Sequence, residues 1–150
     1  MKKNNKKGFT LAELLIVVAI IAVLVAIAIP VFTKRLEASR ETADMANLRS
    51  AYAAAQVALL SNDPDDNIGK NMYFDPSSQI GLSASPSDST RMGKGTTLDG
   101  GADVSSLPRV GDNAAEIYNN TVAAAGKSIK ITFDAAGTQA AKITEMGFAD

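Results

Sequence analysis

Glu13 is a single carboxylate inside an otherwise apolar part of the sequence, and its chemistry most needs an explanation. It separates the mostly apolar residues 9–12 from residues 14–29, sixteen positions without a polar side chain. A charged side chain deep in a bilayer costs roughly 2.5–3.5 kcal/mol on insertion scales, and an unpaired charge is most costly in such a medium. Glu13 therefore predicts a cationic partner.

The composition excludes most other chemistry. The chain has no Cys, which excludes disulfides, thiolate catalysis and Cys-ligated metals. It has no His, which removes the commonest general base and most zinc and haem sites. The formal net charge of −1 argues against a nucleic-acid-binding protein. We therefore expect neither enzyme activity nor a cofactor.

One acidic segment has part of the pattern of a metal-binding loop. Asp63, Asp65 and Asn67 have the spacing of the first ligands in an EF-hand calcium loop. However, Gly69 falls one position late, and Phe74 stands where the last ligand should be Glu. An acidic turn is the preferred interpretation, and calcium binding is the alternative.

The element that positions Glu13 is a long apolar helix. Residues 9–32 would form about 36 Å of helix, which spans a hydrocarbon core of about 30 Å. Residues 14–29 alone would reach only about 24 Å, so the span must include Glu13 near one edge. Four lysines precede the span, at positions 2, 3, 6 and 7. We therefore expect a single-pass segment in the cytoplasmic membrane, with its N-terminus inside and the C-terminal part outside.

A cleaved secretory signal peptide is the alternative interpretation of this region. Residues 26–28, Ala-Ile-Ala, have the small residues of a cleavage site. Cleavage there would give a mature chain that starts at Ile29 with Pro30 in second place, and it would leave Glu13 unexplained. The membrane-spanning interpretation is therefore preferred.

The sequence after Pro30 predicts that the helix continues to about Leu60, because it is rich in Ala, Leu, Glu and Arg and has no Gly. One side of this helix is charged at first, at Lys34, Glu37, Glu41 and Asp44. The same side is apolar afterwards, at Met45, Leu48, Tyr52, Ala55 and Leu59. We expect the chain to leave the charged part uncovered and to cover the apolar part.

A second helical stripe is made mainly of small residues. It consists of Phe32, Leu36, Ser39, Ala43, Ala46, Ser50, Ala53, Val57 and Leu60. It predicts a face for neighbouring helices, and one broad core face is the alternative.

The remainder, residues 61–150, predicts a small head. Residues 61–111 read as a loop, in which residues 72–74 could contact the core. A short helix is expected over 113–125, with a stop at Gly126. A strand over 129–133 and a weaker partner over 138–144 follow, and together they form a C-terminal hairpin. So small a sheet needs the long helix to cover one face.

The junction Lys6-Lys7-Gly8-Phe9-Thr10-Leu11-Ala12-Glu13 resembles the class III signal of type IV pilins and pseudopilins. That resemblance implies an α+β, pilin-like fold, in which one long helix over about 9–60 packs on a small antiparallel sheet with a long loop. The implied organisation is a cleaved leader (1–8), a membrane or filament-core helix (9–32), an amphipathic half (33–60) and a head (61–150).

The resemblance also implies a processing and assembly site. Prepilin peptidase would cut between Gly8 and Phe9, and the new Phe9 amine would be N-methylated. Glu13 would pair with the Phe9 amine of an adjacent subunit, or with the amine of its own chain one helical turn away. Pro30 removes one helical hydrogen bond, and the helix before it would melt in the filament.

The expected function is structural. The resemblance implies a filament subunit, a homo-oligomer and the major pilin of a type IV pilus (a fimbrium), assembled by a membrane platform and an ATPase. The alternatives are a minor pilin or a pseudopilin of type II secretion or competence, and a monomeric membrane-anchored binding module. Nucleic acid is not expected as a direct ligand.

Overall fold

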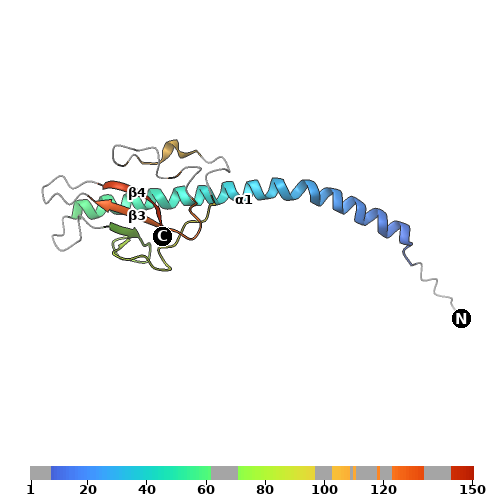
Figure 1. The fold of residues 1–150 in the computed structure, drawn as a ribbon, viewed down its shortest axis with the longest axis horizontal. Helices are drawn as coiled ribbons and strands as arrows, with labels where there is room; N and C mark the ends of the chain where they lie inside the picture. Colours follow the sequence, from blue (N-terminus) through green and yellow to red (C-terminus); the bar gives the residue numbers. More distant parts are fainter. Residues whose placement is uncertain are drawn as a thin grey trace. The chain divides into compact units, whose positions relative to one another are not determined.

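The computed structural model describes residues 8–61, 71–96, 103–108, 110, 118, 123–133 and 143–150. The chain divides into two compact units, Met1–Arg35 and Leu36–Asp150, and each is described by itself. One helix, α1 (Leu11–Ser61), supplies residues to both units. The first unit holds the apolar half of α1, and the second holds the other half of α1 and the sheet (Figure 1).

Helix α1 starts two residues later than the expected position 9, because Thr10 is its N-cap rather than its first turn. It continues through Pro30 without a break, as expected. Pro30 has no N–H for the carbonyl one turn earlier, but its own carbonyl accepts a 3.1 Å hydrogen bond from the Thr33 hydroxyl. Loss of helical structure before Pro30 in a filament, which the resemblance implies, stays a prediction.

Four antiparallel strands form one sheet in the order β2-β1-β3-β4. Their bounds are β1 Asn71–Phe74, β2 Leu82–Ser83, β3 Ser128–Phe133 and β4 Ile143–Ala149. Strands β3 and β4 pair from Ser128↔Ala149 to Phe133↔Ile143, with a register shift at Thr132/Phe133. The α+β class and the C-terminal pair of strands are thus confirmed.

Several predicted bounds in the head were wrong. The partner of β3 starts at Ile143 and runs to Ala149, whereas the expected strand was 138–144. The predicted loop 61–111 contains β1 and β2. In the predicted helix 113–125, the described residues Tyr118 and 123–125 are not helical, and the rest lies outside the described residues. Strand β1 is identified by its pairing with β3. The sequence did not predict it because four residues are too few to show a clear alternation of apolar and polar side chains.

The core lies between the second half of α1 and one face of the sheet. Leu48, Ala51 and Ala55 of the helix are fully buried, and so are Ile129 and Ile131 of β3. Met72 and Phe74 of β1, Leu82 of β2 and Met146 of β4 belong to the same cluster. The expected apolar side of the helix is confirmed, since Met45 is also buried and Tyr52 and Leu59 pack against the cluster.

The stripe of small residues lies outside this core. Leu36, Val57 and Leu60 on that stripe are 41%, 59% and 81% exposed. Ser39, Ala46, Ser50 and Ala53 are exposed as well. The alternative of one broad core face is therefore wrong for the described residues, and contact with neighbouring helices remains a prediction.

The expectation that the charged side of the helix is uncovered is confirmed for Lys34 but was wrong for the three acidic residues that follow it. Glu41 and Asp44 are fully buried, and the Glu37 side chain is only 14% exposed. Asp44 Oδ1 accepts the Lys94 N–H at 2.8 Å, and its Oδ2 accepts the Gly95 N–H at 2.7 Å. Consecutive backbone amides from a distant loop therefore meet carboxylates of the helix, which a helical wheel cannot show.

Close approach explains the glycines of this segment, Gly93–Thr96, which we call the glycine segment. A Cβ on Gly95 would lie 2.3 Å from the Tyr118 hydroxyl, and one on Gly93 would lie 1.8 Å from the Ala124 carbonyl oxygen. The Gly95 carbonyl in turn accepts N–H groups of Ala124 and Ala125, at 3.1 and 2.7 Å. The segment is thus bound both to α1 and to the turn before β3.

The two carboxylates that bind the glycine segment have opposite pKa shifts. Burial raises the pKa of Asp44, although the Gly95 and Lys94 amides and the Tyr118 hydroxyl act against that rise. For Glu37, burial acts to raise the pKa, but the amide and hydroxyl of Thr96 hold it below its usual value. Burial beside these acids also raises the pKa of Tyr118.

These directions predict opposite pH dependences for two isosteric variants. A raised folded pKa stabilises the fold below the ordinary value of 3.8 for Asp44, and that contribution is lost as the pH rises through the folded pKa. The melting temperature of wild type minus that of Asp44→Asn should therefore fall between about pH 3 and about pH 7. The measurement is thermal unfolding of a fragment of residues 33–150.

Glu37→Gln is the matched control for this experiment. Because the folded pKa of Glu37 is lowered, its contribution is present above the ordinary value and is lost on acidification. The difference between wild type and Glu37→Gln should therefore rise over the same pH range. Equal slopes of the same sign for both variants would contradict this assignment of the two carboxylates.

Candidate processing and assembly site

The junction between Gly8 and Phe9 lies in exposed, non-helical backbone immediately before α1. Both residues are exposed, and the Phe9 side chain is 87% exposed. A Cβ built on Gly8 would meet no other atom within 4 Å. The lysines that precede the junction lie outside the described residues. The peptide bond at the predicted cleavage position is thus accessible in the part of the chain that the structure describes.

Thr10 and Glu13 form a reciprocal cap on the first turn of α1. The Thr10 N–H and hydroxyl both donate to Glu13 Oε2, at 2.7 and 2.8 Å, and the Glu13 N–H donates to the Thr10 hydroxyl at 3.2 Å. This is a capping box, which satisfies N–H groups that a helix start otherwise leaves unpaired. The sequence reasoning used Glu13 but missed Thr10, although the T-x-x-E spacing was readable.

The cap places Glu13 in a defined orientation. Both bonds from Thr10 go to Oε2, so among the described residues Oε1 accepts no hydrogen bond. A carboxylate with one oxygen fixed and the other available can take a further donor without losing its cap. The structure brings Thr10 and Glu13 together, and Phe9 precedes this cap by one residue in the chain.

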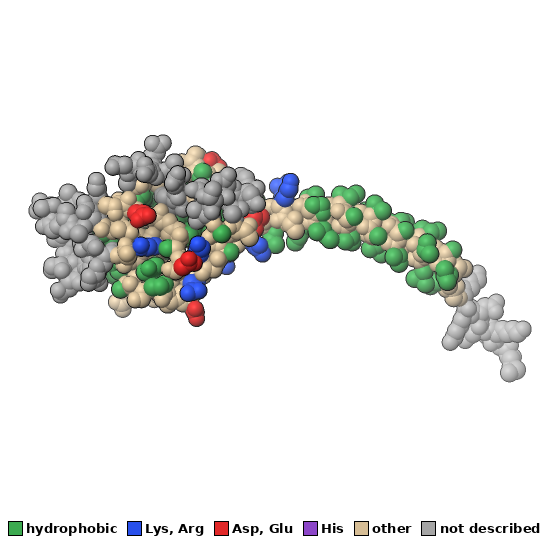
Figure 2. All heavy atoms as spheres, in the orientation of Figure 1, with side chains coloured by type: hydrophobic (Ala, Val, Ile, Leu, Met, Phe, Trp, Pro, Cys, Tyr) green, Lys and Arg blue, Asp and Glu red, His purple; other side chains and the backbone are tan. Residues whose placement is uncertain are grey.

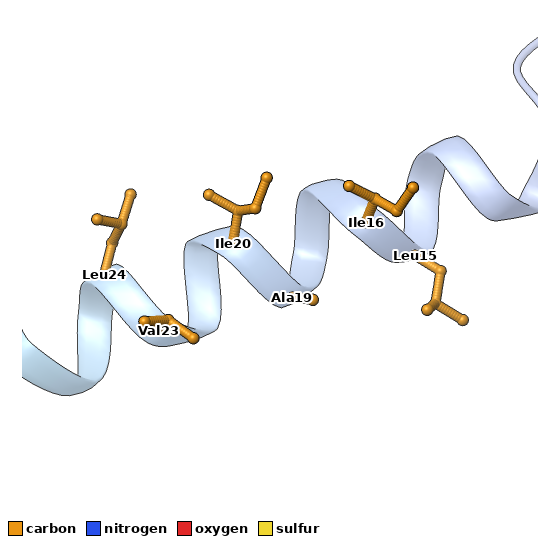
Figure 3. A pocket seen from close by; sticks show the side chains of 6 residues that line it. All are labelled: Leu15, Ile16, Ala19, Ile20, Val23 and Leu24. Carbon is orange, nitrogen blue, oxygen red and sulfur yellow. The ribbon is translucent and has the colours of Figure 1, made fainter.

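The helix surface after the cap is apolar on all sides. The large hydrophobic side chains from Leu11 to Phe32 are 46–81% exposed, and green atoms cover this part of the helix in Figure 2. In Figure 3, Ile16, Ile20 and Leu24 form a row on one side of the helix. They line a shallow groove with Leu15, Ala19 and Val23, and a single helix forms the whole wall of that groove.

Such a surface requires another apolar medium or another apolar surface against it. The described residues include one helix that is long and apolar enough to cross a membrane, and it is this one. A stretch of exposed large hydrophobic residues of this length is a contact surface and not an ordinary solvated face. The groove in Figure 3 is therefore one face of that contact surface and not a small-molecule pocket.

The remaining predicted site residues fall into two groups. Pro30 lies inside α1 with an exposed side chain, 17 residues after Glu13, so the two are far apart along the helix. The weak calcium candidates Asp63, Asp65 and Asn67 lie outside the described residues. Among the described residues, no group of three acidic side chains is arranged to hold a metal ion.

A comparison with protein families also finds a known motif in this N-terminal region. Residues 3–29 match the family model of the prokaryotic N-terminal methylation motif. The chain is 40% identical over 72 residues to the type IV major pilin protein PilA of Myxococcus xanthus, which covers 48% of this chain and 33% of that protein. No solved structure matches the chain.

Two further relatives carry similar names. The type IV major fimbrial protein FimA of Dichelobacter nodosus is 39% identical over 89 residues, 58% of this chain and 53% of the relative. The type IV narrow pilus major component PilA5 of Thermus thermophilus is 52% identical over 54 residues, 34% of this chain and 47% of the relative.

The chain thus spans between a third and about half of the length of these curated relatives. The methylation motif lies at the start of the long apolar helix, and the described residues also form a small antiparallel sheet. The chain therefore carries the prokaryotic N-terminal methylation motif and is similar, over part of its length, to type IV major pilins and fimbrial proteins.

Proposed function

We propose that this chain is the major subunit of a type IV pilus, a helical filament held together by its N-terminal helices. The observation that carries the proposal is the methylation motif directly before an apolar helix whose large side chains are exposed from Leu11 to Phe32. Before assembly this surface lies in the cytoplasmic membrane, with the N-terminus inside. After assembly the helices of other subunits cover it.

The proposed maturation is cleavage between Gly8 and Phe9 by prepilin peptidase, followed by N-methylation of Phe9. The exposed backbone and the missing side chain at Gly8 support it, since a protease must fit extended chain into its cleft. The new amine then stands one residue before Thr10. It adds a cation at the positive end of the helix dipole, where a carboxylate partner stabilises it.

The proposed assembly contact joins that amine to Glu13 of an adjacent subunit. Thr10 supports it by holding Oε2 of Glu13 and leaving Oε1 for the incoming donor. In an apolar medium such a pair satisfies two charges that would otherwise remain unpaired. The amine of the same chain is the competing partner before assembly. An assembly platform and its ATPase supply the work of extraction, and the subunit itself is not an enzyme.

The composition of purified filaments tests the proposed function. Filaments sheared from the producing cells should contain this chain as their most abundant protein, and its N-terminal peptide should begin with methylated Phe9. The measurement is mass spectrometry of the intact subunit and of its peptides. A trace amount would instead indicate a minor subunit, and absence from filaments would indicate a monomeric anchored protein.

Replacement of Gly8 tests the processing step. In Gly8→Leu the added side chain occupies space that is open in the chain but not in the protease cleft, so the precursor should accumulate in the membrane. Intact mass measured on the membrane fraction should include residues 1–8. Asn5→Leu, within the leader but away from the junction, is the control. Normal maturation of Gly8→Leu would refute the assigned junction.

Replacement of Glu13 tests the assembly contact. Glu13→Ala removes a charge that membrane insertion does not need, so insertion and cleavage should persist while sheared filament falls at least about tenfold, equivalent to 1.4 kcal/mol. Leu14→Ala, next to it on the helix, is the control and should assemble. Filament yields from cells that produce only one variant provide the measurement. Wild-type yield from Glu13→Ala would remove Glu13 from the mechanism.

A further inference from the structure

Two exposed cations, Lys34 and Arg35, follow the apolar part of α1 and have no assigned role. Both side chains are exposed, and in the part of the chain that the structure describes neither takes part in an ion pair or a hydrogen bond. Arg91 and Lys94 in the head share this property, but they do not follow the apolar part of α1, and two other cations of the described residues are paired. Arg40 pairs with Glu37 at 3.3 Å, and Lys127 lies 3.9 Å from Asp150.

The position of these cations matches the thickness of a membrane. Lys34 lies 21 residues after Glu13 in one continuous helix, or about 32 Å at 1.5 Å per residue. The hydrocarbon core of a bilayer is about 30 Å thick. No residue between Glu13 and Lys34 is charged. A membrane-spanning α1 with Glu13 at one hydrocarbon boundary therefore has Lys34 and Arg35 at the opposite boundary, where lipid headgroups begin.

We propose that Lys34 and Arg35 form a binding site for the phosphate groups of membrane phospholipids. The inference rests on the proposed function, because it requires α1 to span the membrane before assembly. A guanidinium donates two parallel N–H groups to phosphate oxygens, and an ammonium donates to them as a point charge. Both side chains have apolar stems that can extend along the helix, so their charged ends reach the headgroups.

A second copy of the chain is the competing partner, and the structure argues against it. The acidic side chains nearest in sequence on α1 are Glu37, Glu41 and Asp44. Glu41 and Asp44 are fully buried in their own chain, and Glu37 is bound to Thr96 and Arg40. The same helix of a neighbouring subunit therefore does not offer these carboxylates to Lys34 or Arg35.

Solid-state NMR can detect the proposed contact directly. The full chain, with ¹³C at the Cζ of its five arginines, is reconstituted into vesicles of phosphatidylcholine and phosphatidylglycerol. Dephasing of the Cζ signal by ³¹P then reports arginines next to phosphate. We expect dephasing of about one fifth of the arginine signal, because one arginine of five is in contact, and its loss in Arg35→Lys. Lysine keeps the charge but removes the labelled carbon.

Arg49→Lys is the matched control, because Arg49 is also an exposed arginine of α1 but is hydrogen-bonded to Ser106 of the head. This variant should keep the dephased signal. Lys34 is tested in the same way with ¹⁵Nζ-labelled lysine and Lys34→Arg, and Lys127→Arg serves as its control. No phosphorus dephasing in wild type, or dephasing that persists in Arg35→Lys, would overturn the inference and favour a protein partner.

Alkaline carbonate extraction of the same vesicles separates this inference from the proposed function. Chain that is released by carbonate does not span the bilayer, and that result would refute the membrane stage of the proposed function. Chain that is retained without phosphorus dephasing would leave the spanning helix in place and refute only the phosphate site.

Discussion

A single helix has to satisfy two different environments, and the rest of the structure follows from that constraint. Over its first 22 residues α1 has no buried side chain, and its large residues are all apolar except Glu13. Over its last 20 residues it forms one wall of the core against β1, β3 and β4. No break in the backbone separates the two, because Pro30 is accommodated within the helix. The change of environment is therefore encoded by side chains alone.

The head depends on carboxylates where many secreted domains of this size use disulfides. The chain has no Cys, and long segments between its strands must be held by other means. Asp44 and Glu37 bind three consecutive amides of the glycine segment, and that segment binds the turn before β3. Several donors satisfy each of these carboxylates, and these hydrogen bonds offset part of the cost of burying them. The acidic side of the helix is thus part of the interior.

The sequence was sufficient to predict those helices and strands whose pattern is long or depends only on neighbouring residues. A run of apolar residues predicted α1 to within two residues, and alternation predicted β3 with its buried Ile129 and Ile131. Sequence-based prediction failed where residues distant in the chain decide whether a side chain is buried or a strand forms. A wheel shows that Glu37, Glu41 and Asp44 share a side, but it contains no information about Gly95, which lies 51 residues away from Asp44 and covers it. Strand β1 depends similarly on its register with β3. Of the site, Glu13 was readable from its charge, and Thr10 could have been recognised from the local T-x-x-E spacing.

The cap on α1 has a consequence for the timing of maturation. Every atom of the capping box belongs to Thr10 or Glu13, and both residues lie downstream of the proposed cleavage position. Removal of the leader therefore takes away four positive side chains and creates one new amine, while the three hydrogen bonds of the capping box stay in place. The hydrogen bonds that cap the helix therefore do not depend on the leader, whereas the new amine changes the charge at the helix start and so its interaction with the helix dipole. In the proposed function, the precursor thus already has the hydrogen bonds of its first helical turn, and a single hydrolysis changes the charge beside them.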